Sequence, residues 1–192
     1  MVKGCWLLIG LFILQACRNP YIKQDPPELF STTDDSELYF KNVRQIFYYR
    51  TTDTTQREFF RIKSMPQNNN VPLIGLCIVN HWKADKAFLL LEPNGWFVSE
   101  DSIEVLWHDA QNPLIHGKIF FEQGPIYKHY FFALEIYRGI LKEYKFEVRQ
   151  RNRKAPFLED EEAREAFRIT VKDFLKLINQ LEESEKILES SP

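Results

Sequence analysis

The sequence predicts an α+β fold, in which a mainly antiparallel, twisted sheet is covered on one face by a C-terminal amphipathic helix. Hydrophobic residues make up 44% and aromatic residues 15% of the 192 residues, which is ample material for a packed core. From Leu38 onward, short segments rich in aromatic and β-branched residues alternate with turn signals, a pattern typical of strands. Near the C-terminus the apolar residues recur instead at intervals of three and four, which is the helical period.

The first two predicted strands, residues 43–50 and 57–63, form a hairpin around the polar turn 51–55. In the second of them Phe60 and Ile62 alternate with basic residues, which predicts one buried side and one solvated side. A sheet of about eight strands tends to curl, so a half-open barrel is the main alternative to an open sheet. The further strands are expected at residues 73–82, 87–92, from 96–98 onward, 103–107, 118–122, 130–140 and 144–149.

The C-terminal helix is predicted at residues 163–181, where apolar residues share one face and polar residues fill the other. The acidic run 159–162 precedes it and complements the positive end of the helix dipole. We expect the apolar stripe to pack on one face of the sheet, and docking to a partner or a membrane is the alternative. The stripe consists of Ala163, Ala166, Phe167, Thr170, Val171, Phe174, Leu175, Ile178 and Leu181.

The N-terminus has the features of an export signal. Lys3 precedes an apolar stretch at 5–14, which is about half as long as a membrane-spanning helix and fits the core of a signal peptide. Residues 14–17, Leu-Gln-Ala-Cys, then resemble the lipobox of bacterial lipoproteins. The alternatives are an ordinary secretory signal that is cut after Ala16 and an apolar N-terminus that is buried in a core.

The lipobox resemblance implies that residues 1–16 are a lipoprotein signal peptide and that the chain is cut before Cys17. In that family the cysteine thiol receives diacylglycerol and the new amine is usually acylated, and two or more acyl chains anchor a protein durably. Arg18, directly after the cysteine, favours the outer membrane, with the domain facing the periplasm. The expected partner of the anchor is therefore the membrane.

The rest of the chain divides into three predicted segments. Residues 17–36 contain three prolines and a polar run, which predicts a lipid-anchored flexible tether. Residues 37–183 are expected to form a single globular domain, and residues 184–192 a frayed tail. Within the domain Cys77 has no partner cysteine, so we expect it to be a small buried core residue.

No motif predicts catalysis, a cofactor or a metal. In an acidic segment that contains one histidine, a helix would bring Glu100, Glu104 and His108 to one face. The residues resemble a strand at least as much, and a strand would bring only Glu104 and His108 to one side, which is fewer ligands than a metal site needs. Ser99 and Ser102 lie near Asp101 and His108, but without the glycine-flanked elbow of a nucleophilic serine. We therefore expect no enzyme activity. The acidic segment comprises Glu100, Asp101, Glu104, His108 and Asp109.

One basic run stands out, which comprises Arg149, Arg151, Arg153 and Lys154. The net charge of −2 at pH 7 argues against nucleic-acid binding, which usually accompanies a basic excess. We expect a solvated strand end that balances the acidic residues 159–162. Contact with anionic lipid headgroups or lipopolysaccharide phosphates is the alternative.

Two aromatic triplets, residues 47–49 and 130–132, predict rings on both faces of their strands. One face is expected to meet the helix, and rings exposed on the other would mark a protein-binding or ligand-binding surface. A core filled on both sides is the alternative. The predicted anchor, the tether and the lack of a catalytic motif together favour a non-catalytic envelope lipoprotein that binds an envelope protein partner or serves an assembly. The alternatives are a carrier of small apolar ligands or lipids and a hydrolase of envelope polymers.

Overall fold

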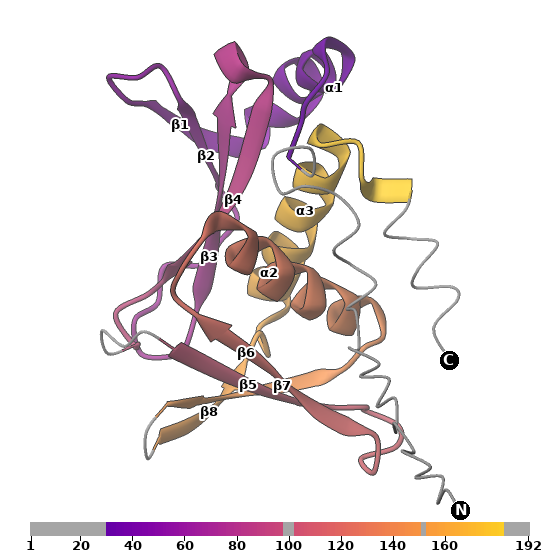
Figure 1. Cartoon of the computed structure of the whole chain (residues 1–192). Helices are drawn as coiled ribbons and strands as arrows, with labels where there is room; N and C mark the ends of the chain where they lie inside the picture. The colour runs from indigo at the N-terminus through magenta and orange to yellow at the C-terminus, as the bar shows by residue number, and fades with distance from the viewer. Residues whose placement is uncertain (1–29, 98–101, 151–152, 183–192) are drawn as a thin grey trace, which may run out of the picture.

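The computed structural model of the chain describes residues 30–97, 102–150 and 153–182, and it has the predicted α+β architecture. Its strands form two four-stranded antiparallel sheets, ordered β1-β2-β3-β4 and β6-β5-β7-β8. Helix α2 (Ile126–Leu141) packs between the two sheets, and helix α3 (Glu161–Leu177) lies against the first (Figure 1). The strands are therefore divided between two sheets, whereas the sequence predicts a single open or curled sheet.

The first sheet is a meander. Asp53 closes its first hairpin, because one carboxylate oxygen accepts two backbone N–H groups at 2.9 and 3.0 Å. Phe60, Ile78 and Leu89 are register neighbours, and all three are fully buried. These contacts confirm the predicted hairpin, its buried side and the strands expected at 73–82 and 87–92. The four strands are β1 (Tyr48–Thr52), β2 (Glu58–Ile62), β3 (Ile74–His81) and β4 (Lys86–Pro93).

The second sheet has β5 and β7 at its centre and α2 as the connection from β6 to β7. Val105 of β5 pairs with Ile119 of β6 and Val148 of β7, and the three side chains join the buried core. The strands expected at 103–107, 118–122 and 144–149 are confirmed. The fourth strand was not predicted, because a proline and two cations are atypical of a strand interior. The strands are β5 (Ser102–His108), β6 (His116–Glu122), β7 (Lys145–Gln150) and β8 (Arg153–Phe157).

The strand predicted at residues 130–140 is wrong, because these residues lie inside helix α2. Tyr130, Leu134 and Tyr137 are buried at helical spacing, but so are Phe132 and Ile136 on other sides of the helix. A helix that packs between two sheets is apolar nearly all round, so its period is hard to see in the sequence. Its aromatic residues favoured a strand by propensity alone, and tertiary packing overrides that preference.

The strand predicted at residues 43–50 begins only at Tyr48. Before it the chain forms a short helix, α1 (Asp34–Tyr39), a π-helical turn, η1 (Phe40–Arg44), and a 3₁₀ turn, η2 (Gln45–Phe47). Thr33 and Ser36 form a reciprocal capping box that starts α1. The helical turns place Phe40 over Phe60, with ring centroids 5.0 Å apart.

The strand expected from residue 96 is also absent from the described residues. Trp96 lies in a turn that follows Asn94, whose side-chain oxygen accepts the backbone N–H of Trp96 at 3.3 Å. Residues 98–101 lie outside the described ranges.

The packed region begins by Phe30, before the boundary expected at residue 36. The Phe30 ring contacts Phe88 and Tyr130, with centroids 5.9 and 5.6 Å away, and its carbonyl accepts the N–H of Ala87 at 3.0 Å. Ser36 donates its hydroxyl to the carbonyl of Leu177 at 2.7 Å. Residues 30–36 thus pack on the domain and are not part of an extended tether. The predicted signal peptide, the predicted lipidation site Cys17 and the predicted frayed tail lie outside the described residues.

Helix α3 confirms the predicted C-terminal helix. Asp160 caps it, since its carboxylate accepts the N–H of Ala163 at 3.0 Å. Phe167, Val171 and Phe174 are fully buried and face β3, β4 and α2. The apolar stripe therefore packs on the domain's own sheet, as expected. A further short helix between β3 and β4 is the 3₁₀ turn η3 (Trp82–Ala84).

A candidate protein-binding groove between strand β6 and helix α2

The described residues of the acidic segment, Glu104, His108 and Asp109, do not gather as metal ligands. Glu104 instead lies 3.6 Å from Arg149 and 3.8 Å from Lys118, and no group of three metal-ligating side chains occurs among the described residues. Ser102 and His108 stand at opposite ends of β5, about 20 Å apart at about 3.3 Å per residue, which is too far for a catalytic pair. Glu100, Asp101 and Ser99 lie outside the described residues.

The described residues of the basic run contact acids of their own sheet and one ring outside it. Lys154 lies 2.8 Å from Glu147, Arg149 pairs with Glu104, and the Arg153 guanidinium stacks 4.2 Å from the Trp96 ring centroid. The described residues of the run are thus balanced by acids of neighbouring strands and by a ring in the turn after β4, and not by the acidic residues 159–162 as expected. Arg151 lies outside the described residues.

Cys77 is fully buried on β3, as predicted. Burial raises the pKa of its thiol to about 12, so the thiol stays protonated at neutral pH. A protonated thiol is a poor nucleophile, which fits a core residue.

The aromatic triplets behave differently from each other. In the first, Tyr48 is buried and donates its hydroxyl to Asp173 at 2.7 Å, whereas its two neighbours are exposed. In the second, Tyr130 and Phe132 are buried, and Phe131 is partly exposed beside Tyr127, with ring centroids 6.3 Å apart. The second triplet therefore contributes rings both to the core and to the surface, but from a helix and not from a strand.

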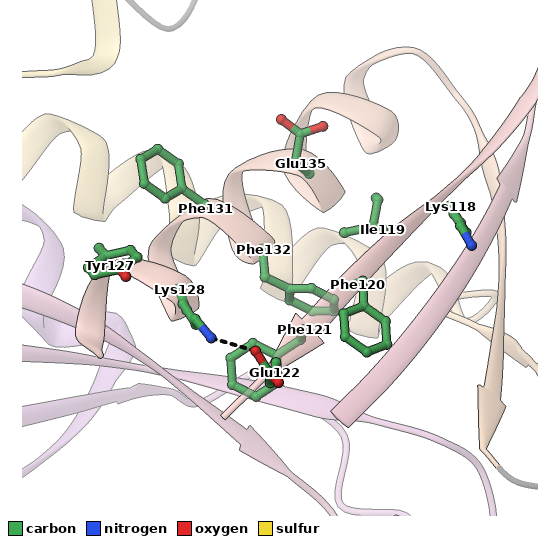
Figure 2. Close-up of a pocket in the computed structure, with 10 residues that line it drawn as sticks. All are labelled: Lys118, Ile119, Phe120, Phe121, Glu122, Tyr127, Lys128, Phe131, Phe132 and Glu135. Atoms are coloured by element: carbon green, nitrogen blue, oxygen red, sulfur yellow. Dashed lines mark hydrogen bonds and ion pairs between the residues drawn. The ribbon is translucent and has the colours of Figure 1, made fainter. Parts of the chain in front are cut away.

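Phe131 and Phe132 line a surface groove of about 390 Å³ between β6 and α2 (Figure 2). At its floor, the rings of Phe121 and Phe132 meet with centroids 5.5 Å apart. Side chains of both faces of β6 take part, which places the groove at the strand's open edge. The lining residues are Lys118, Ile119, Phe120, Phe121 and Glu122 from β6, and Tyr127, Lys128, Phe131, Phe132 and Glu135 from α2.

Charged side chains bound the apolar floor of this groove. Lys128 reaches across from α2 to Glu122 on β6, with a nitrogen–oxygen distance of 2.7 Å (Figure 2). This contact lowers the pKa of the Glu122 carboxyl and keeps it ionised. Glu135 pairs along the helix with Arg138 at 3.0 Å. The groove thus has an aromatic centre and a charged rim, an arrangement that is common at protein-binding surfaces.

Strand β6 is an end strand, because β5 is its only neighbour among the described strands. Phe120 projects from it with 61% of its surface exposed. The end strand β8 differs, since Pro156 and two cations protect it from pairing. Residues 118–122 are therefore an apolar, accessible strand edge in the described part of the chain. The sequence offered one signal for it: three consecutive apolar residues in a half-buried strand must place at least one of them outward.

The end strand β4 is covered where it passes α2. The N–H of Leu91 donates to Nδ1 of His129 at 3.1 Å, and the N–H of Ala87 donates to the carbonyl of Phe30. His129 also packs against Phe121, with ring centroids 5.0 Å apart. The imidazole thus links the covered edge of the first sheet to the groove floor in the second.

We expect the protein to lose stability as the pH falls below about 6.5, because His129 must be neutral to accept the Leu91 N–H. Burial lowers the pKa of His129 from 6.5 in the folded state. A lowered folded pKa means that this stabilisation is complete above the unfolded pKa and is lost as the pH falls through the folded pKa. Measured by urea unfolding, the free energy of unfolding should fall more steeply from pH 7.5 to pH 5 for the wild type than for His129→Gln. Parallel curves for the two proteins would contradict this role.

None of the helices in the described ranges is long and apolar enough to cross a membrane. Comparison with known proteins gave no matching family model, no similar curated protein and no similar solved structure.

Proposed function

We propose that this protein is a non-catalytic envelope lipoprotein whose domain binds a protein partner at the β6–α2 groove. The lipid on Cys17 holds the domain at the periplasmic face of the outer membrane. The partner adds an extended segment to the open edge of β6 and sets apolar side chains against the aromatic groove. Main-chain hydrogen bonds then supply affinity, and the groove supplies specificity.

The observation that carries the proposal is an unpaired strand edge that runs beside an aromatic groove. Five residues of β6, 118–122, line the groove over about 13 Å at about 3.3 Å per residue. Residues 127–135 of α2 span about 12 Å at about 1.5 Å per residue. The two walls are thus matched in length, and four to five extended residues fill the space between them.

The openness of the groove favours a protein segment over a small ligand. A carrier of apolar ligands encloses most of its cargo. Here Phe120 and Tyr127 are exposed along the rim, so a bound lipid or small apolar molecule would stay in contact with water. An extended polypeptide tolerates that exposure, because its outward side chains can be polar.

Site-specific photocrosslinking in intact envelopes tests the binding proposal. A photoreactive amino acid at position 120 is expected to give a discrete crosslinked protein. The same amino acid at position 154, on the protected edge β8, is expected to give none. In a Cys17→Ala background the adduct at position 120 should fall strongly, because the domain leaves the membrane. Absence of any adduct at position 120 in the lipidated protein would refute the proposal.

The anchor has its own test. Mass spectrometry of the protein purified from membranes should find residue 17 at the N-terminus, with acyl chains on its sulfur and amine. An intact Met1 and an unmodified thiol at position 17 would exclude the lipid anchor but would not bear on binding at the groove.

A further inference from the structure

We infer that the partner at β6 is a second copy of this chain, whose own β6 pairs antiparallel to it across a two-fold axis at Phe120. The inference rests on the proposed function, because lipid-anchored copies share one membrane and meet at a high effective concentration. A two-fold interface uses the same surface on both copies, so that surface must be complementary to itself.

Residues 118–122 are self-complementary in this sense. Lys118, Phe120 and Glu122 alternate with buried residues and all face solvent on the same side of the sheet. With the axis at Phe120, Lys118 lies opposite Glu122 of the partner subunit, and Glu122 lies opposite the partner subunit's Lys118. Phe120 faces its own symmetry mate. Opposite charges and aromatic rings that face each other across strands both stabilise a sheet.

This register is favoured over its neighbours. Moving the axis to residue 119 would set Phe120 against the partner's Lys118. Moving it to residue 121 would set Phe120 against the partner's Glu122. Only the axis at Phe120 pairs ring with ring and both charges with their opposites.

The contacts that Lys118 and Glu122 already make within the chain do not prevent them from pairing with a second copy. Lys118 has 71% of its side chain exposed and its contact with Glu104 is long, at 3.8 Å. Glu122 is bound by Lys128 at 2.7 Å, but 61% of its side chain remains exposed. A carboxylate has two oxygens that accept several hydrogen bonds, so Glu122 can hold Lys128 and a second lysine together.

The pairing also covers the groove. A two-fold axis perpendicular to the second sheet joins that sheet of one copy to the same sheet of the other. The result is one continuous eight-stranded sheet, with both α2 helices on the same face. The rims that carry Tyr127 and Phe131 then approach each other above the paired β6 strands. The dimer removes an open apolar edge that would otherwise remain available for uncontrolled pairing.

The test is co-purification of two differently tagged full-length chains expressed together. Wild-type copies are expected to co-purify. Lys118→Glu in both copies sets like charges opposite each other at two positions, and Glu122→Lys in both copies does the same. Each is expected to reduce co-purification about tenfold, since both symmetric pairs turn from attraction to repulsion. Lys118→Glu in one copy with Glu122→Lys in the other restores both opposite-charge pairs, so co-purification should return.

Lys145→Glu is the matched control. Lys145 is an exposed lysine at the end of β7, away from the β6 edge, so its reversal changes the net charge equally but leaves the interface intact. Failure of the mixed pair to recover, or loss with Lys145→Glu as well, would overturn the inference. Wild-type copies that never co-purify, while position 120 still crosslinks to another envelope protein, would overturn the inference and leave the proposed function standing. The absence of any adduct at position 120 would refute both the inference and the proposed function.

Discussion

Asp173→Ala is expected to lower the free energy of unfolding by about 3 kcal/mol, because it removes one partner of a buried ionic contact. Asp173 is buried on α3 and accepts the Arg44 Nε–H at 2.8 and 2.9 Å and the Tyr48 hydroxyl at 2.7 Å. Burial and the carboxylate together raise the pKa of Tyr48 well above its usual value, so it stays a neutral donor. Arg44 retains partial solvent contact, which places the expected loss at the low end for such contacts.

Urea unfolding of the full chain measures this loss. Asp173→Asn keeps an oxygen acceptor at the same place, so it should lower the free energy of unfolding clearly less than Asp173→Ala does. The double variant Asp173→Ala with Tyr48→Phe should cost less than the sum of the two single changes, because both remove the same hydrogen bond. A loss below about 1 kcal/mol for Asp173→Ala would mean that the contact does not hold α3 to the N-terminal turns.

Phe174→Ala is expected to cost about 3 to 5 kcal/mol, the range for removing a fully buried ring. Its ring lies 6.5 Å from that of Phe30 and 6.0 Å from that of Tyr130, so it joins α3 to α2 and to the N-terminal segment. Loss of this ring should also release residues 30–33, which limited proteolysis would detect as earlier cleavage there.

The matched control is Leu114→Ala. Leu114 is 86% exposed, so its truncation to alanine should change the unfolding free energy by less than about 0.5 kcal/mol. If Phe174→Ala were equally mild, the three rings would not form the junction described above.

The elements that could be predicted from the sequence are those that bury only one face. Helix α3 packs one stripe on one sheet, so its period is visible from Ala163 onward. Strand β2 buries one side only, so the alternation at Phe60 and Ile62 gave its orientation correctly. In each case local pattern and tertiary packing agree.

The features that could not be predicted have two packed faces or depend on distant partners. Helix α2 contacts both sheets, which hides its period and led to a strand. The division of the strands into two sheets depends on which strands pair across long connections, such as β5 with β7 across α2. The polar residues 31–36 resemble a tether locally, and only contacts with distant residues, such as Asp85 and Leu177, make them part of the domain.

The candidate site combines both kinds of feature. Strand β6 was predicted in place, but its position at the end of a sheet depends on the pairing of the whole sheet. The other wall comes from α2, which was predicted as a strand. The groove could therefore not be foreseen, although the run Ile119–Phe121 already implied an exposed ring.

The most direct measurement of the central claim is amide hydrogen exchange of the full chain in lipid vesicles at increasing protein-to-lipid ratio. If β6 is the edge at which the protein pairs, those amides of residues 117–122 that point away from β5 become more protected as the ratio rises, while those of β8 exchange at an unchanged rate. Exchange of the β6 amides that is fast and independent of the ratio would contradict the account.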